Sequence, residues 1–408
     1  MIPYRQALAI LLQEARRDGV LHAQTVPADR AAGRVLAAKV LAPEPLPSFD
    51  NSSMDGFALK AADTRSASRK KPARLEVLGA LAAGDAPRGP AGAQGAVEVT
   101  TGAPVPKGLD AVVKVEDVRV VEEDGRRFVE LSSPAESGLH VRRRGKDIAA
   151  GTAVADPGTL LQARHLLALA ALGVPEVKVR RRPQVAVLST GRELAGSGET
   201  PGPGRIRNST AAYLACALQA AGAEAYFFGD CPDDPHDFDR RLAAALGGRP
   251  DVVVTTGAVS MGPHDFVTRE VERLGAETLF HKAAIRPGRP LLAARLREGP
   301  LLLGLPGNPV STVVGLRFFL LPYLRRRLGL PEETPFKMAL EEDVPKPEGL
   351  RCFFKAASSV SPSGASVRCL PGQASFQIRP LLEADSWAVL PEKGDRARAG
   401  TAVEVWPL

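Results

Sequence analysis

Residues 183–194, with the sequence PQVAVLSTGREL, decide the fold of the central part of the chain. An unbroken apolar run, Val185 to Leu188, follows a proline, which is typical of a buried strand. The polar, glycine-containing residues that come next are typical of a loop. A strand that is apolar on both faces belongs to a parallel sheet with helices on both sides.

The same order of strand, loop and helix recurs along the next 140 or so residues. We expect helices at about 209–221, 238–246 and 265–274, strands at 224–228, 251–254 and 301–303, and a long helix that ends near residue 328. Strands that alternate with helices predict a mostly parallel, doubly wound sheet.

Three of the expected strands lead into polar loops: STGREL at 189–194, TTGAVSMG at 255–262 and GLPGNPVS at 304–311. In doubly wound sheets, ligands bind beyond the carboxyl ends of the strands. Free N–H groups and hydroxyls near a helix N-terminus suit a phosphate group. One such loop would be an ordinary structural turn, but three in one sheet predict a ligand crevice.

The flanking segments have other patterns. Residues from Tyr4 onward predict an amphipathic helix, and the leucine spacing of residues 160–173 predicts a second one. Between Arg74 and Leu131, short β-rich runs separated by Gly/Pro turns predict a small β domain inserted between two pieces of another domain. Short strands return after Pro331, which predicts a C-terminal β domain.

The loop 47–57, PSFDNSSMDGF, is too polar for a buried strand and too poor in helix formers for a helix. Its Asp55-Gly56 pair marks a turn. We expect Phe49 and Phe57 to anchor the two ends of the loop in a core, while the residues from Asp50 to Asp55 stay exposed. Taken alone, the loop reads as an ordinary turn rich in Asp and Asn.

The composition favours anionic partners. The 408 residues contain 53 Lys and Arg against 46 Asp and Glu, a net charge of +7, with arginine clusters at 142–144, 180–182 and 325–327. Nucleic acid is not expected as a partner, because no aromatic residue is interleaved with these arginines and no nucleic-acid-binding motif is present. Solvated domain edges are the alternative explanation for each cluster.

Cysteine usage and hydropathy indicate a cytoplasmic protein. The four cysteines are far apart and form no CxxC pair, so neither a zinc nor an iron–sulfur site is expected and a reducing compartment is the default. The N-terminus does not resemble a signal peptide, and no apolar stretch is long enough for a membrane span.

Several multi-residue motifs, read in order, resemble the MoeA family of molybdopterin molybdenumtransferases, to which the C-terminal domain of gephyrin is related. They extend from residue 47 to the end of the chain: PSFDNSSMDGFAL, TTGAPVPKGLDAVVKVE, VRRRGKDI, STGREL, TTGAVSMGPHDFV, IRPGRP, GLPGNPVS and a closing segment around Leu390-Pro391-Glu392.

The resemblance implies an elongated homodimer with four domains per chain. They are a discontinuous, α-rich linking domain (1–43 and 140–182), an inserted β domain (44–139), a doubly wound α/β domain similar to MogA and MoaB (183–328) that binds the pterin nucleotide, and a C-terminal β barrel (329–408). The site would lie between the third domain and the inserted domain of the partner subunit.

The resemblance also implies the reaction. Adenylyl-molybdopterin is cleaved with release of AMP while molybdate is inserted, with Mg²⁺ as cofactor. Hard oxygen ligands suit that cation. The carboxylates in the family motifs are the candidate catalytic residues Asp55, Asp147, Glu193 and Asp265, of which Asp55, Glu193 and Asp265 are the candidate metal ligands.

Oxyanions need donors rather than carboxylates. The candidate substrate-binding residues are Thr100, Thr101, Ser189, Thr190, Gly191, Thr256, Gly257, Ser260, Lys282, Arg286, Arg289, Pro306, Gly307, Asn308, Ser311, Ser375 and Arg379. Other molybdenum cofactor biosynthesis proteins are candidate further partners.

The chain departs from the family pattern at several positions. Arg286 and Arg289 stand where lysines are usual, Ala258 replaces a glycine, and Asn208 and Thr210 stand where an aspartate and an asparagine are common. Two alternatives therefore stay open: a catalytically altered pterin-binding or scaffolding paralogue, and a molybdopterin adenylyltransferase.

Overall fold

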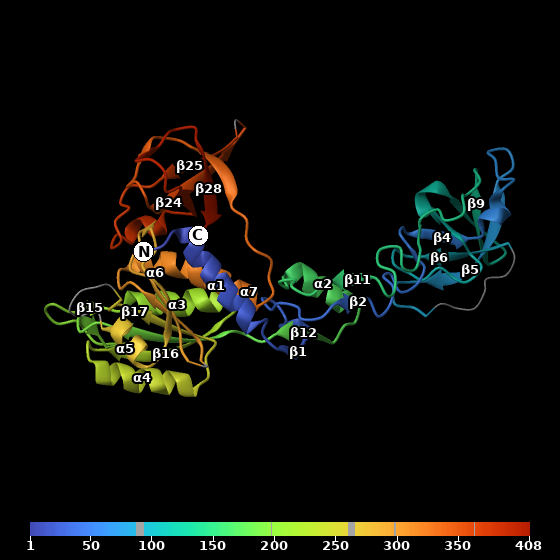
Figure 1. Ribbon diagram of the computed structural model, residues 1–408. Coiled ribbons are helices and arrows are strands. Elements are labelled where there is room, and N and C mark those ends of the chain that lie inside the picture. Colours follow the sequence, from blue (N-terminus) through green and yellow to red (C-terminus); the bar gives the residue numbers. More distant parts are fainter. Residues whose placement is uncertain (87–93, 197, 260–265, 298, 363) are drawn as a thin grey trace.

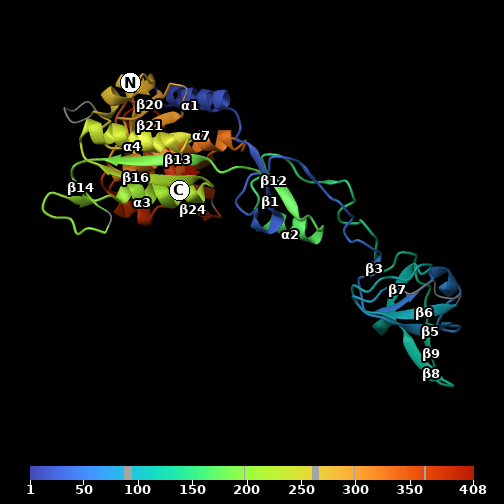
Figure 2. The ribbon, with the colours of Figure 1, turned by 90° about the horizontal axis from the view of Figure 1, so that it is seen from below.

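The computed structural model describes residues 1–86, 94–196, 198–259, 266–297, 299–362 and 364–408. The molecule is elongated (Figures 1 and 2). An α/β region and a C-terminal barrel form one end, a slender middle section follows, and a distal β lobe forms the other end. Among the described residues, no helix is long and apolar enough to cross a membrane.

The α/β region is built on a six-stranded sheet in the order β16-β13-β17-β21-β20-β18. Four strands are parallel, as predicted: β16 (Glu224–Cys231), β13 (Gln184–Thr190), β17 (Val252–Thr256) and β21 (Leu301–Leu305). The sequence did not indicate the two antiparallel edge strands, β20 (Leu292–Arg295) and β18 (Glu277–His281).

Both faces of this sheet are covered, as the unbroken apolar run in β13 requires. Val185 and Val187 pack into one core, and Ala186 and Leu188 pack into a second core on the other face. The sheet is therefore doubly wound. The remaining elements of the region are α3 (Ser209–Ala220), α4 (Pro235–Gly247), α5 (Val267–Arg273), α6 (Pro309–Gly315) and the short pair β14 (Leu194–Ala195) and β15 (Ile206–Arg207).

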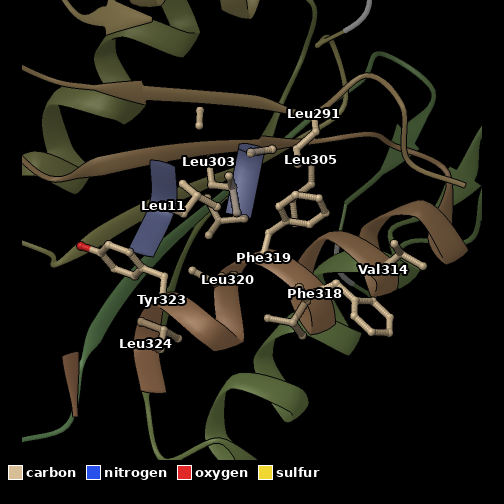
Figure 3. Close-up of a cluster of buried hydrophobic side chains, with 14 of the residues drawn as sticks. Leu11, Leu291, Leu303, Leu305, Val314, Phe318, Phe319, Leu320, Tyr323 and Leu324 are labelled. Atoms are coloured by element: carbon tan, nitrogen blue, oxygen red, sulfur yellow. The ribbon is translucent and has the colours of Figure 1, made fainter. Parts of the chain in front are cut away.

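The long helix expected to end near residue 328 is one continuous helical run. It comprises α6, a π-helical turn at Leu316–Leu320 and α7 (Leu321–Arg327). The wider turn directly precedes Pro322, which has no N–H to donate to the preceding turn. Figure 3 shows Phe319 and Tyr323 of this run facing the same core as Leu303 and Leu305 of β21.

The N-terminal helix α1 (Tyr4–Asp18) packs against α7, with Leu11 fully buried between α7 and the sheet (Figure 3). One carboxylate oxygen of Asp18, Oδ2, accepts hydrogen bonds from Arg295 (3.1 Å), Arg327 (3.3 Å) and the Tyr323 hydroxyl (2.5 Å). Because these groups are largely buried, the ion pairs need one another to offset their loss of hydration. They fix α1 to the α/β region.

The middle section is formed by residues from two distant parts of the chain. β1 (Ala23–Pro27) pairs with β12 (Glu176–Arg180), and β2 (Val40–Leu41) pairs with β11 (Ala153–Ala155). The predicted second helix is α2 (Ala163–Ala171), which packs here through Leu169. The section is thus discontinuous in sequence, as expected.

The distal β lobe is a six-stranded sheet in the order β7-β4-β6-β5-β9-β8. The β-rich runs predicted between residues 74 and 131 are strands in it. The strands are β4 (Gly56–Leu59), β5 (Ala73–Leu81), β6 (Gly95–Val99), β7 (Ala111–Lys114), β8 (Arg119–Glu123) and β9 (Arg126–Leu131). The chain enters and leaves the lobe through the pair β3 (Asn51–Ser52) and β10 (Val141–Arg142).

The C-terminal barrel closes through five strands, each paired with the next and the last with the first. They are β22 (Phe336–Leu340), β25 (Gly364–Cys369), β24 (Arg351–Ser361), β26 (Ser386–Leu390) and β28 (Ala402–Pro407). The short β23 (Val344–Pro345) pairs with β27 (Arg396–Ala397). One strand from the α/β region, β19 (Ile285–Arg286), adds to β24 and joins the two parts.

Candidate functional site

The three polar loops predicted to form a crevice meet at the carboxyl edge of the parallel strands. Gly257 has a φ of +90°, and a Cβ built on it would lie 2.4 Å from the Thr190 carbonyl oxygen. A Cβ on Gly307 would lie 3.5 Å from the Gly257 Cα. The loops after β13, β17 and β21 are therefore in direct contact, and they approach closely because both contact positions are glycines.

Buried hydroxyls form the floor of this junction. Thr190 Oγ1 donates to the Thr256 carbonyl (3.1 Å), and Thr256 Oγ1 donates to Ser189 Oγ (3.1 Å). All three side chains are buried, at 4% exposure or less. These predicted substrate-binding residues hold the loops together, and their side chains are engaged within the protein.

Glu193 is exposed at the end of the first loop, and its carboxylate lies over Gly191. A Cβ on Gly191 would come within 2.7 Å of both carboxylate oxygens of Glu193. The glycine therefore makes room for the carboxylate, while its N–H donates to the Cys231 carbonyl (3.0 Å).

A second carboxylate, which the sequence analysis did not single out, lies next to Asn208. The Asn208 side chain caps α3 by accepting from the Ala211 N–H (3.0 Å), and its Nδ2 donates to Asp230 Oδ1 (2.5 Å). Both residues line a pocket of about 480 Å³ that Phe227 and Arg207 also border. β16 extends to Cys231, beyond the residue 228 expected from its apolar run, and this places Asp230 at the carboxyl edge of the sheet.

Two of the predicted cations lie in a cleft of about 480 Å³ between the α/β region and the barrel, which we call the arginine cleft. Six predicted substrate-binding residues line it: Arg286, Arg289, Pro306, Asn308, Ser311 and Ser375. Pro287, Gly288, Pro347, Gln373 and Phe376 are among the other residues of its lining. No carboxylate is among the described residues that line it.

The two guanidiniums of the arginine cleft are exposed, and neither has a carboxylate within ion-pair distance in the described part of the chain. The pairing of β19 with β24, Arg286 opposite Cys352, fixes the first of them to the barrel. Planar guanidiniums present several N–H donors in a fixed geometry, which suits an oxyanion.

Four other predicted residues lie elsewhere or outside the described residues. Arg379 is 89% exposed, pairs with Glu383 and does not line the cleft. Lys282, with a φ of +71°, accepts from the Ile2 N–H through its carbonyl and does not line the cleft either. Ser260 and Asp265 lie outside the residues that the structure describes.

Ala258 has a φ of +50°, so the loop does use the conformation for which glycine is usual. An L-residue there costs about 1–2 kcal/mol, partly offset by the greater freedom of glycine in the unfolded chain. We expect Ala258→Gly to raise the free energy of unfolding by about 0.5–1 kcal/mol in a denaturant titration. An equal decrease would show that the native loop does not strain this residue.

In the distal β lobe, Asp55 is exposed and accepts two hydrogen bonds from Thr101, from its N–H (2.6 Å) and its hydroxyl (3.0 Å). The hydroxyl of the neighbouring Thr100 accepts from the Ala83 N–H (3.1 Å). The structure therefore brings Asp55, Thr100 and Thr101 together, at the turn between β3 and β4.

The prediction that two phenylalanines anchor the ends of this loop was half wrong. Phe57 is fully buried in β4, but Phe49 is 46% exposed. Hydrogen bonds hold that end instead: Asp50 accepts from the Arg143 side chain and the Arg144 N–H, both at 2.7 Å. Partial burial would raise the pKa of Asp50, but these hydrogen bonds outweigh it and lower that pKa.

Asp147 is exposed in the return segment beside this loop, and its N–H donates to the Leu46 carbonyl (3.0 Å). It belongs to the same end of the molecule as Asp55. Glu193 directly precedes β14 of the α/β region, and that region forms the other end of the molecule (Figures 1 and 2). One chain therefore does not bring Asp55 and Glu193 together. In the described residues, no group of three His, Cys, Asp or Glu could hold a metal ion.

Comparison with known proteins covers nearly the whole chain. Residues 2–173 match the MoeA N-terminal region (domain I and II), residues 186–326 a probable molybdopterin binding domain, and residues 337–408 the MoeA C-terminal region (domain IV). The molybdopterin molybdenumtransferase of Synechococcus elongatus is 41% identical, over 100% of both chains. That of Bacillus subtilis is 33% identical, over 91% of this chain and 86% of the relative.

A solved structure of a molybdopterin biosynthesis MoeA protein from Pyrococcus horikoshii superposes with a TM-score of 0.82 at 30% identity, covering 99% of this chain and 98% of the other. Sequence and architecture thus agree over the full length. The chain belongs to the MoeA family.

Proposed function

We propose that this chain is a molybdopterin molybdenumtransferase, which inserts molybdate into adenylyl-molybdopterin and releases AMP. The arginine cleft is the observation that carries the proposal. Among the described residues, it gathers two guanidiniums that have no carboxylate within ion-pair distance, together with Ser311 and Ser375, around a space that no carboxylate lines. It lies next to the junction of the three polar loops. A tetrahedral dianion such as molybdate needs that set of donors.

The two arginines hold the oxyanion in this mechanism. Because a guanidinium keeps its charge at any working pH, Arg286 and Arg289 neutralise the dianion and orient it by paired N–H donors. The pterin nucleotide occupies the adjoining edge of the sheet. Gly257, which has no side chain, lets the loops on either side approach closely at that edge. The phosphate groups of the pterin nucleotide and the molybdate are thereby held next to each other for the insertion that releases AMP.

Two carboxylates, Asp55 and Glu193, act on the phosphoanhydride of adenylyl-molybdopterin. Asp55 and Glu193 are both exposed and both supply hard oxygen ligands, the type that suits Mg²⁺. A bound Mg²⁺ supplies charge neutralisation at the phosphate oxygens as the AMP group leaves. Because one chain holds these carboxylates at opposite ends, the proposal includes a homodimer in which Asp55 of one subunit faces Glu193 of the other.

The two alternatives lack an equivalent observation. A molybdopterin adenylyltransferase would not need a cleft with one wall supplied by a C-terminal barrel. The paralogue with altered catalysis is suggested by Ala258, by Arg286 and Arg289 in place of lysines, and by the missing carboxylate at Asn208. Asp230 lies 2.5 Å from the Asn208 side chain, so a carboxylate is still present at this edge.

The test is the release of AMP from adenylyl-molybdopterin by the wild-type protein with Mg²⁺. We expect release to depend on molybdate, or on tungstate in its place, and sulfate serves as the matched dianion control. If the protein binds the pterin nucleotide but releases no AMP with either metal oxyanion, the proposed enzyme is contradicted and the pterin-binding paralogue is supported.

A further inference from the structure

A buried lysine of the barrel that the reaction does not use lies directly behind the arginine cleft. Lys355, on β24, is 0% exposed. Its Nζ donates to the carbonyls of Gly372 (2.6 Å) and Gln377 (2.9 Å). No ion pair of Lys355 with a carboxylate occurs in the described part of the chain, and burial lowers its pKa to about 8.

The loop that Lys355 contacts, residues 370–377, is built around it. The Gln373 amide donates to the Lys355 carbonyl (2.9 Å) and the Leu370 carbonyl (2.6 Å), and its oxygen accepts from the Lys355 N–H (3.0 Å). The Gln377 side chain accepts from the Ala374 N–H (3.1 Å). Backbone and side chain of one lysine therefore hold both ends of the loop.

The same loop forms one wall of the arginine cleft, through Gln373, Ala374, Ser375 and Phe376. The Ser375 carbonyl accepts from the Val310 N–H (3.0 Å) at the start of α6, next to the cleft residue Ser311. The loop thus connects the barrel to the α/β region at the edge of the cleft.

We infer that Lys355 is a positioning residue: it holds loop 370–377 against α6 and so sets the width of the arginine cleft for the oxyanion. A lysine buried without a counter-ion disfavours folding compared with an apolar residue of similar size. Its two hydrogen bonds go to Gly372 and Gln377, which flank the wall residues 373–376 on either side, so the role fits oxyanion binding better than stability. That the bound group is molybdate rests on the proposed function.

The first test is amide hydrogen exchange in Lys355→Met, with Lys346→Met as the matched control. Lys346 is the other buried lysine of the barrel, and its Nζ donates to the carbonyls of Glu392 and Gly394, which do not line the cleft. We expect faster exchange in peptides covering 306–314 and 370–379 for Lys355→Met alone. Unchanged exchange in both peptides overturns the inference, whether or not the protein releases AMP.

The second test separates KM from kcat. Loss of the contact is expected to raise the KM for molybdate about tenfold while kcat stays within about twofold of wild type. Lys346→Met should change neither constant. Lys355→Gln, whose uncharged amide is too short for both carbonyls, should fall between wild type and Lys355→Met. A fall of about tenfold in the kcat of Lys355→Met with an unchanged KM for molybdate would show that Lys355 serves only the fold.

Discussion

Mixed dimers of Asp55→Ala and Glu193→Ala are expected to recover AMP release that neither variant shows alone. Each single substitution should reduce release by about 100-fold or more, because it removes one oxygen ligand beside the phosphate that carries the developing charge. Both side chains are exposed, so Glu193→Ala should not alter the thermal unfolding temperature. Asp55→Ala should lower it slightly, because it removes the two hydrogen bonds from Thr101.

Recovery follows from where the structure holds the two residues. Asp55 directly precedes β4 of the distal β lobe, and Glu193 directly precedes β14 of the α/β region, which forms the opposite end of the molecule (Figures 1 and 2). In a two-fold dimer, a hybrid of the two variants has one site with both substitutions and one site with neither. Random mixing makes half of the dimers hybrids, so about one quarter of the wild-type rate should return.

The matched control is a mixture of each variant with a subunit that carries both substitutions, which contains no intact site. Subunits must be exchanged by unfolding and refolding together, and hybrid formation checked by mass. If hybrids form and the mixture remains inactive, the two carboxylates do not share a site across subunits.

Gly257→Ala is expected to lower the free energy of unfolding by about 2–5 kcal/mol and to abolish AMP release. Its φ of +90° disfavours an L-residue, and the new Cβ would lie 2.4 Å from the Thr190 carbonyl oxygen and 2.8 Å from its hydroxyl. The backbone would have to move at the point where the three loops meet. Both stability and the site depend on this contact.

Gly275→Ala is the control for backbone conformation alone. Gly275 has a φ of +75° and open space where the Cβ would be, so the change should cost about 1 kcal/mol. It should leave AMP release unchanged. Equal effects of the two substitutions in denaturant titrations would mean that the loops do not touch as described.

The central sheet was predictable because its strands are apolar on both faces and its loops carry glycine and hydroxyl residues. β18 and β20 were missed because residues 277–295 contain charges and prolines. They join the sheet only through long-range pairing, β20 with β21 and β18 with β20. Burial of Phe49 was wrongly expected. An aromatic residue predicts burial only where a core surrounds it, and here the ion pair of Asp50 with Arg143 and its hydrogen bond from the Arg144 N–H hold the loop.

Much of the arginine cleft could be predicted from motifs, because Arg286, Arg289 and Ser311 stand in ordered family matches. The wall around Gln373 and its support by Lys355 could not, since they depend on how the barrel strand β24 and a distant loop fold together. Asp230 had a signal that was overlooked: it follows an apolar strand directly, as the residues of the predicted loops do.

The measurement that tests the account most directly is the ratio of molybdenum inserted into the pterin to AMP released, in one reaction with adenylyl-molybdopterin, Mg²⁺ and molybdate. The account predicts one molybdenum for each AMP, with neither product formed by Asp55→Ala or Glu193→Ala alone. Release of AMP without molybdenum in the pterin would contradict it, because the arginine cleft would then not deliver the oxyanion to the site of cleavage.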